Sequence, residues 1–191
     1  MRNICLAITI AGAAMGISHR TFAATITHDQ GSGNQDDRIT ISGEIMSEDF
    51  AKFKEIALRV DHAVVYLDSP GGDLSTSIKI GRLVRAMDFF TAVNEATCAS
   101  GCALIWLAGQ FKFLSPNARV GFHLPSYQNT LKAGSENISA IYALSGAYLA
   151  SLGYSEASIA LMSDTPSNQI KWLTNSNSRF FGVSVLLNTM K

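Results

Sequence analysis

The sequence carries little charge of either sign. Only 16% of its 191 residues are charged, and 15 basic side chains balance 15 acidic ones. This balance leaves no basic surface of the kind that binds nucleic acid. Disorder is excluded as well, because apolar residues make up 47% of the chain and can build a substantial core. We therefore expect one globular domain without a nucleic-acid partner.

The sequence also lacks an apolar run long enough for a typical membrane span. The apolar stretch over residues 4–17 has about 14 residues, whereas a spanning helix needs about 20. It follows Arg2 and precedes the small residues of "TFAAT", where cleavage is simplest after Ala23 or Ala24. This order is typical of a secretory signal peptide. We expect residues 1–23 to be a signal peptide and the protein to be periplasmic or secreted, with an uncleaved anchor as the alternative.

Cysteine is scarce, with three in the chain, and export would decide whether they can form a disulfide. Removal of the signal peptide takes away Cys5 and leaves Cys98 and Cys102. An oxidising compartment permits a disulfide, and an i,i+4 pair can come close enough if the backbone at Cys98 is not fully helical. Two small buried side chains are the alternative interpretation. Two cysteines and a distant histidine do not make up a zinc site, so we expect no metal and no cofactor.

The rest of the chain divides into a lead-in and one domain. Residues 24–37 are polar and contain glycine, which predicts a flexible lead-in. Residues 38–191 alternate strand and helix patterns. The predicted strands cover residues 38–45, 63–68, 89–94, 111–114, 119–123 and 183–187. The predicted helices cover residues 47–60, 74–87, a segment beginning near 100, 135–152, 155–162 and 175–181. This alternation predicts an α/β fold with a parallel sheet.

A glycine pair stands at one strand-to-helix turn. The stretch "LDSPGGDL" (67–74) follows a buried strand and opens a helix. Its glycines let the backbone turn sharply and expose N–H groups at the positive end of the helix. Such groups can stabilise a developing oxyanion. A phosphate-binding loop is a competing interpretation, although the lysine of that motif is absent, and a tight turn without function is another.

The stretch "CASGCALIWLAG" (98–109) repeats this arrangement. Ser100 would lie at the N-terminus of a helix, where negative charge is favoured, although an ordinary helix start explains it too. A serine needs a base to become a useful nucleophile. After export the chain keeps His28 in the lead-in, His62 between a helix and a strand, and His123 at the end of a strand. We favour His123 as the base, because an active-site loop is expected where that strand ends.

The segments "YLDSPGGDLSTSIKI", "CASGCALIWLAG" and "LSPNARVGFHLP" resemble the three signature blocks of the Clp protease proteolytic-subunit family. They occur in the family's order, and the resemblance covers roughly residues 38–187. It implies a Clp/crotonase-like spiral of ββα units in a single α/β domain. It also implies that Ser100 is the nucleophile, that His123 is the general base, and that the N–H groups of Gly72 and Gly101 form an oxyanion hole.

The family's third catalytic residue, an aspartate, has no obvious counterpart here. The corresponding region reads "SDTPSNQIKWL" (163–173), and we expect Asn168 to orient His123, with Asp164 as the second candidate. Asparagine can orient a catalytic histidine, but it supplies no charge. A turn residue or a helix cap is the alternative for both. "ASG" is closer to signal-peptide peptidase relatives, which pair serine with lysine, but no motif places a lysine near Ser100.

The resemblance implies peptide-bond hydrolysis through an acyl-serine. An exported chain would meet no ATP, so we expect an ATP-independent serine peptidase that acts on peptide or protein substrates without an ATPase partner. Family members form rings through the helix after the histidine block, and residues 135–152 could make a homo-oligomer, although packing on the chain's own core explains that helix equally. The alternatives are a catalytically silent, ring-forming module on the same fold and a crotonase-like acyl-CoA enzyme.

Overall fold

The computed structural model describes residues 23–33, 35–125 and 138–187. Its strands are β1 (Thr25–Asp29), β2 (Asp37–Ser42), β3 (Ala63–Asp68), β4 (Phe90–Val93), β5 (Thr97–Ala99), β6 (Lys112–Leu114), β7 (Arg119–Phe122), β8 (Lys171–Leu173) and β9 (Leu186–Leu187). Its helices are α1 (Asp49–Ala57), α2 (Leu74–Ala86), α3 (Gly101–Ala108), α4 (Ile138–Ser151), α5 (Glu156–Met162) and the 3₁₀ helix η4 (Ser178–Phe181). Within these ranges no helix is long and apolar enough to cross a membrane. The expected signal peptide lies outside the described residues except for Ala23, as do the first three residues of the helix expected over 135–152.

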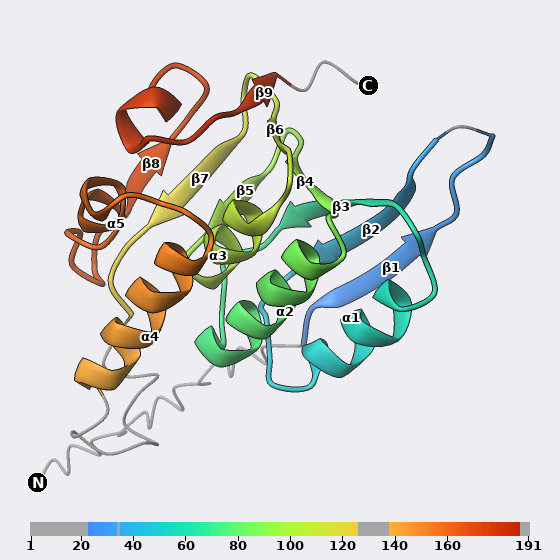
Figure 1. Ribbon diagram of the computed structural model, residues 1–191, viewed down its shortest axis with the longest axis horizontal. Helices are drawn as coiled ribbons and strands as arrows, with labels where there is room; N and C mark the ends of the chain where they lie inside the picture. Colours follow the sequence, from blue (N-terminus) through green and yellow to red (C-terminus); the bar gives the residue numbers. More distant parts are fainter. Residues whose placement is uncertain (1–22, 34, 126–137, 188–191) are drawn as a thin grey trace, which may run out of the picture.

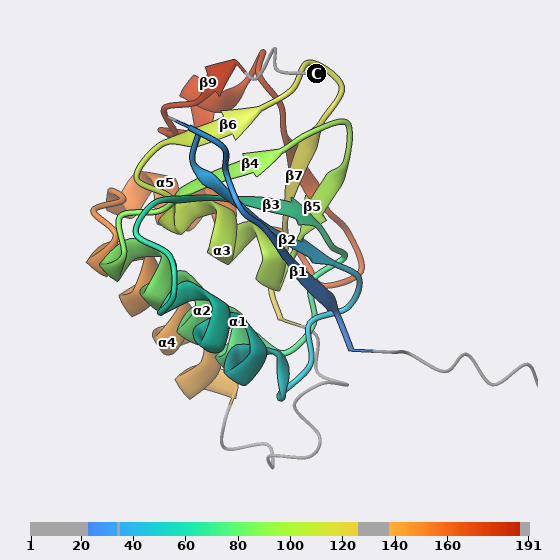
Figure 2. The same ribbon diagram turned by 90° about the vertical axis from the view of Figure 1, so that its right-hand side faces the viewer.

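The strands form two sheets. The larger has six strands in the order β1-β2-β3-β4-β6-β9, and the smaller has three in the order β5-β7-β8. Helices α1, α2 and α3 lie together on one side of the larger sheet, and α4 lies beyond α2 and α3 (Figures 1 and 2). Strands β2 to β9 of the larger sheet are parallel, which confirms the α/β class. Contrary to the prediction from the alternation, the sheets are not parallel throughout, because β1 pairs antiparallel with β2 and β8 pairs antiparallel with β7.

The expectation of a flexible lead-in is corrected for residues 25–29. They form β1, whose register on β2 runs from Thr25 opposite Ser42 to Asp29 opposite Arg38. Most β1 side chains are exposed. Polar residues are therefore tolerated there, and the segment has the composition of a loop although its backbone is paired with β2. The hairpin is closed by Asp37, which accepts hydrogen bonds from the Gly31 N–H at 2.8 Å and pairs with His28 Nε2 at 2.8 Å. The Gly31 hydrogen bond, aided by His28, lowers the pKa of Asp37 below its usual value.

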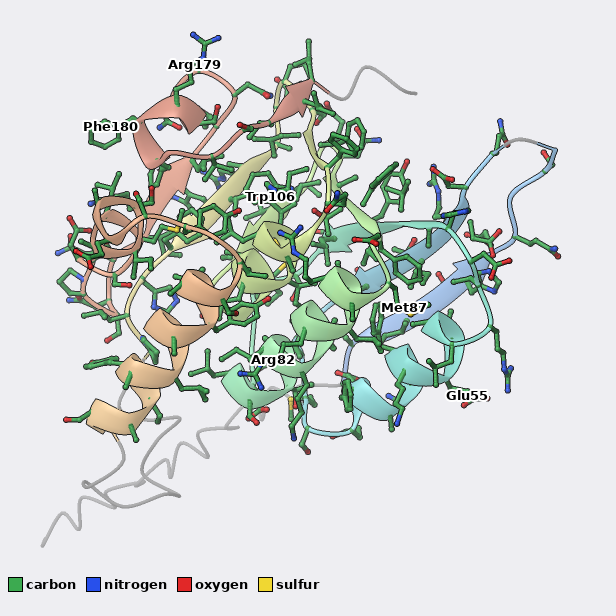
Figure 3. All side chains as sticks on the ribbon, in the orientation of Figure 1. Glu55, Arg82, Met87, Trp106, Arg179 and Phe180 are labelled. Atoms are coloured by element: carbon green, nitrogen blue, oxygen red, sulfur yellow. A yellow bond between two sulfur atoms is a disulfide. The ribbon has the colours of Figure 1, made fainter. Side chains whose placement is uncertain are left out.

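Helix α3 is the apolar centre of the molecule. Seven of its eight residues are buried, which matches a sequence that is apolar on every side. Trp106 is fully buried at the centre of the molecule (Figure 3). It donates from Nε1 to the Phe113 carbonyl at 3.2 Å, while its own carbonyl accepts from Thr91 Oγ1 at 2.7 Å. These bonds tie the second half of α3 to β4 and β6, so the helix whose first residues border the candidate site is anchored to the sheet.

The C-terminal half of α4 packs against α2 and α3. Tyr148 is buried and donates its hydroxyl to the Leu104 carbonyl at 3.0 Å, and Tyr154 donates to the Leu107 carbonyl at 3.0 Å. Burial raises the pKa of both tyrosines, so both remain neutral donors. A side chain at Gly81 in α2 would place its Cβ 1.9 Å from the Tyr148 hydroxyl, so this close approach requires glycine. The packing places one end of α4 beside the start of α3.

Candidate active site

Ser100 occupies a strained backbone conformation between β5 and α3. Its φ of 55° and ψ of −124° lie in a region that residues with a side chain seldom adopt. Such strain costs on the order of 1–3 kcal/mol and clusters at functional sites. Two hydrogen bonds hold it here: the Ser100 N–H donates to the Gly121 carbonyl at 2.9 Å, and the Ser100 carbonyl accepts from the Ala103 N–H at 3.0 Å. The prediction that Ser100 sits on a tight turn at a helix start is confirmed.

A disulfide brackets this turn. Cys98 at the middle of β5 and Cys102 in the first turn of α3 are bonded, with their Cα atoms 5.3 Å apart. The extended backbone at Cys98 satisfies the geometric condition that the sequence left open, because an i,i+4 pair inside a helix lies less favourably for the bond. Both cysteines are fully buried. The strained serine is therefore enclosed in a short covalent loop.

A cavity of about 680 Å³ opens beside Ser100. Four of the residues that the resemblance singled out line it together: Ser100, His123, Gly72 and Gly101. Apolar side chains supply much of the remaining wall, and they come from α3, α4 and α5: Leu104, Ile141, Leu144, Leu149 and Met162. A further wall is the segment between β2 and α1, residues 44–47. The cavity thus joins a polar edge with an apolar surface, which is the usual composition of a binding site for an organic ligand.

Gly72 and Gly101 bring backbone N–H groups close to Ser100. A Cβ on Gly71 would lie 2.7 Å from Ser100 Cβ, and a Cβ on Gly101 would lie 3.6 Å from the Gly72 nitrogen. Gly72 itself has a φ of 143° and lies so close to Ile45 that a Cβ there would meet the Ile45 carbonyl oxygen at 2.1 Å. Only glycine therefore fits at these turns, and the Gly101 backbone packs close to the Gly72 nitrogen.

The Gly72 N–H has no protein acceptor among the described residues, although both neighbouring N–H groups are used. Gly71 donates to Ser69 Oγ at 3.0 Å, and Asp73 donates to the Ile45 carbonyl at 2.7 Å. An N–H that lines a cavity without a partner is available to an acceptor on a ligand. Together with the Gly101 N–H at the start of α3, it can bind an oxygen on which negative charge develops.

His123 follows β7 and is half-buried in the cavity wall. Its Nδ1 lies 2.6 Å from the Leu124 carbonyl oxygen. Because a carbonyl can only accept, Nδ1 must carry the proton in this contact, and Nε2 is left as the proton acceptor of the ring. No hydrogen bond joins His123 to Ser100 Oγ among the residues described. The histidine is thus oriented by a backbone carbonyl, a partner for which the sequence has no signal.

The structure does not bring Asn168 to His123, contrary to expectation. Asn168 is exposed in a turn that the Gln169 N–H closes on the Pro166 carbonyl at 2.9 Å, and it does not line the cavity. The second candidate, Asp164, pairs instead with the Lys171 ammonium group. This hydrogen bond lowers the pKa of Asp164.

The segment that carries Asp164 nevertheless runs beside the histidine strand. The Leu124 N–H donates to the Thr165 carbonyl at 2.8 Å. The backbone is therefore close to the site, while the carboxylate is held by β8 through Lys171. Across the described ranges, no group of three or more His, Cys, Asp or Glu side chains gathers in a way that could hold a metal ion.

No protein-family model and no curated protein matches this sequence. Solved structures do match. An asparagine-to-aspartate mutant of ClpP1 from Listeria monocytogenes is 20% identical, with a TM-score of 0.65, and the match covers 80% of this chain and 92% of that one. The catalytic domain of the ClpP protease from Plasmodium falciparum is 19% identical, with a TM-score of 0.61 and coverage of 80% and 86%.

A serine-to-alanine mutant of the 1510-N membrane-bound stomatin-specific protease is also similar. It is 19% identical, with a TM-score of 0.57, and the match covers 78% of each chain. Each match extends over most of both chains, so the whole domain is similar and not only a part of it. The chain has a ClpP-like fold.

Proposed function

We propose that this protein is an exported, ATP-independent serine peptidase in which Ser100 is the nucleophile and His123 is the general base. The observation that carries the proposal is the strained Ser100 turn, which shares one cavity with His123 and with the N–H groups of Gly72 and Gly101. Strain of this kind is maintained where the surrounding structure requires it, and functional sites are where it gathers. Two of the similar solved structures are proteases, which agrees with this assignment.

In the proposed hydrolysis, Ser100 attacks the peptide carbonyl and His123 transfers the protons. His123 Nε2 accepts the Ser100 hydroxyl proton while Oγ bonds to the carbonyl carbon of the substrate. The carbonyl oxygen becomes negative and is stabilised by the N–H groups of Gly72 and Gly101. The protonated His123 then gives its proton to the leaving amine, and the C–N bond breaks to leave an acyl-serine. A water molecule, deprotonated by the same histidine, hydrolyses that ester and restores Ser100.

The partner of His123 limits the rate that we expect. The Leu124 carbonyl holds the ring in the tautomer that the reaction needs. It carries no full negative charge, so it stabilises the imidazolium less than a carboxylate would. We therefore expect an active serine and slow turnover of peptides.

Location and assembly complete the proposal. The signal-peptide pattern of residues 1–23 supports export to the periplasm or the medium, where ATP and an ATPase partner are not expected. Helix α4 supports a homo-oligomer. It is apolar around its circumference, yet Ala140, Ala143 and Ala147 are exposed and do not line the cavity, while Tyr142 and Leu144, which are 40% and 38% exposed, also line it. An apolar helix is normally buried on all sides, so a second copy of the chain is the partner that we infer for this face.

The proposal is tested with a fluorophosphonate probe on the purified mature protein. We expect labelling that disappears in Ser100→Ala and in His123→Ala. His62→Ala is the matched control, because His62 is exposed and does not line the cavity. Labelling that persists in Ser100→Ala would identify another nucleophile and remove the basis of the mechanism.

A second candidate is a catalytically silent, ring-forming module on the same fold. The observation that favours it is again the His123 contact with a backbone carbonyl, because the described residues place no carboxylate on the histidine. Complete absence of labelling in a folded protein that forms a homo-oligomer would support this candidate.

A further inference from the structure

Asp49 is a fully buried carboxylate outside the catalytic machinery. Its Oδ2 accepts from the Met46 N–H at 2.8 Å and from the Ala24 N–H at 3.1 Å, and its Oδ1 accepts from Lys52 Nζ at 3.0 Å. Among the described residues Lys52 is the one cation paired with it, and the Lys52 side chain is 50% exposed. A buried carboxylate needs strong compensation by charge and hydrogen bonds. Lys52 is therefore partly hydrated, and its ammonium group compensates the buried charge of Asp49 only weakly.

The Ala24 nitrogen is the unusual partner of Asp49. Ala24 is 3% exposed, and its nitrogen lies at one of the two bonds where the sequence predicts cleavage. Cleavage after Ala23 would place small residues at the last and third-last positions of the leader, Ala23 and Thr21, as signal peptides prefer. Cleavage after Ala24 would instead put the bulky Phe22 at the third-last position. The residue pattern therefore favours the bond between Ala23 and Ala24.

We propose that the mature protein begins at Ala24 and that its new α-ammonium group forms a buried ion pair with Asp49. Hydrolysis of the Ala23–Ala24 peptide bond adds the hydroxyl of water to the Ala23 carbonyl carbon and a proton to the Ala24 nitrogen. The amine takes up a second proton from solvent, because an α-amino group has an ordinary pKa of about 7.7–8.0. The 3.1 Å contact of a neutral amide becomes a charge-assisted hydrogen bond, which is the stronger kind. The inference rests on the export that the proposed function includes.

The ion pair would act on the candidate active site through a short series of contacts. Asp49 holds the Met46 N–H, and Met46 belongs to the cavity wall. The adjacent Ile45 donates to the Gly71 carbonyl and accepts from the Asp73 N–H, both at 2.7 Å, and these residues flank Gly72. An ion pair that restricts the motion of Asp49 therefore also restricts the motion of the Gly72 N–H.

The leader itself also touches this wall. Ala23 forms an isolated β-bridge with Glu44, which lines the cavity. Cleavage after Ala23 removes this contact at the same time as it creates the charge next to Asp49. Processing thus replaces a contact of the leader with an internal ion pair, and we expect the processed protein to have the more reactive Ser100.

The cleavage site is tested by exporting the full-length chain from a host with a signal peptidase and measuring the intact mass and the N-terminal sequence. We expect Ala24 as the first residue. A chain that begins at Thr25, or one that keeps residues before Ala24, would overturn the proposal.

The ion pair is tested on two proteins released from a removable fusion, one beginning at Ala24 and the other at Ala23. We expect the Ala24 protein to have the higher Tm, by roughly 5 °C, because only there does the charge reach the buried carboxylate. Acetylation of its N-terminus should abolish the difference, since it removes the charge. Equal Tm values for the unmodified pair would overturn the ion pair. This comparison keeps Asp49 intact, so it does not depend on whether an Asp49 variant folds.

A substitution in each protein supplies the second measurement. Asp49→Asn should lower the Tm of the Ala24 protein by roughly 5–10 °C and that of the Ala23 protein by clearly less. Equal losses in the two proteins would contradict the ion pair. Glu55→Gln is the matched control on the same helix, because Glu55 is exposed (Figure 3). Among the described residues it pairs with Arg59 alone, at 2.8 Å. This substitution should leave the Tm difference between the two proteins unchanged.

The readouts separate this inference from the peptidase proposal. The mass and Tm measurements need no catalytic activity. A Tm difference without any fluorophosphonate labelling would support the ion pair and overturn only the peptidase. Where both proteins label, we expect the Ala24 protein to react several-fold faster, and equal rates would overturn the link between the ion pair and the site.

Discussion

Ser100 donates its backbone N–H to the carbonyl of Gly121 at 2.9 Å. This hydrogen bond ties the strained turn to β7, the strand that ends immediately before His123. Ser100 and His123 are therefore positioned by one pair of neighbouring strands, β5 and β7, which are parallel. The separation of the two side chains depends on how β7 is held from its other edge, where β8 pairs with it.

Substitution of Gly121 by alanine should disturb this arrangement. The new Cβ would lie 2.6 Å from Ile170 Cγ2 and 2.7 Å from Trp172 Cζ3, so these two side chains must shift or push β8 away from β7. We expect a loss of about 1–3 kcal/mol in the free energy of unfolding, as overpacking usually costs, together with slower labelling of Ser100. Urea denaturation and the labelling rate measure the two effects.

A matched control for that change is Gly146→Ala in α4, where a Cβ would meet no atom within 4 Å. Alanine in an open helical position should raise the free energy of unfolding by about 0.4–1 kcal/mol. If Gly121→Ala were as stable as the wild type and labelled at the same rate, β8 would not constrain the strand that leads to His123.

Removal of the disulfide should weaken the turn without unfolding the domain. The bond closes a loop of only a few residues, so chain entropy predicts a loss of about 2 kcal/mol for Cys98→Ala/Cys102→Ala. The labelling rate should also fall, although most of the protein remains folded, because the disulfide loop holds the strained Ser100 in position. Thermal unfolding and the pseudo-first-order labelling rate are the measurements.

Reductant alone should have little effect on the native protein, because both cysteines are fully buried. Alkylation followed by mass spectrometry should find the bond intact after treatment with a thiol reductant, and broken only when denaturant is added. Two free thiols in protein isolated from the exported compartment would contradict the disulfide itself.

The acid and amide candidates for a third catalytic residue should both be dispensable. Asp164 pairs with Lys171, and Asn168 is exposed away from the cavity. We expect Asp164→Ala and Asn168→Ala to label within about two-fold of the wild type, because His123 is oriented by the Leu124 carbonyl. A loss of ten-fold or more in Asp164→Ala would show that its carboxylate reaches His123 during the reaction.

Lys112 should make the stability of the fold depend on alkaline pH. Burial, with repulsion by Arg85, lowers the pKa of this lysine from 10.5 to about 8. The folded state thus disfavours the charged form, so Lys112 reduces stability below pH 8, and this penalty disappears as the pH rises from about 8 toward 10.5. Lys112→Met should therefore lose stability relative to the wild type as the pH increases over this range. Lys79→Met, a change of an exposed lysine on α2, is the control and should show no such trend.

Some elements follow from residues that are close together in the chain, and these could be predicted. The strand over residues 63–68 is apolar and β-branched, and the structure has it with the predicted bounds. Helix α2 begins where Asp73 caps it by accepting from the Thr76 N–H at 2.7 Å. The glycines of "SPGG" and the small residues around Ser100 likewise indicate tight turns, because few other residues adopt those backbone angles.

Other contacts join partners that are distant in the sequence or that belong to the backbone, and these form only when the chain folds. β1 is a strand because β2 offers it a row of hydrogen bonds, although its own composition is that of a loop. The partner of His123 is a backbone carbonyl, which every residue carries and which no residue pattern reveals. Asp49 and Ala24 lie 25 residues apart and meet only after the chain folds. The sequence therefore specified which side chains could react, and the fold decided what holds them in place.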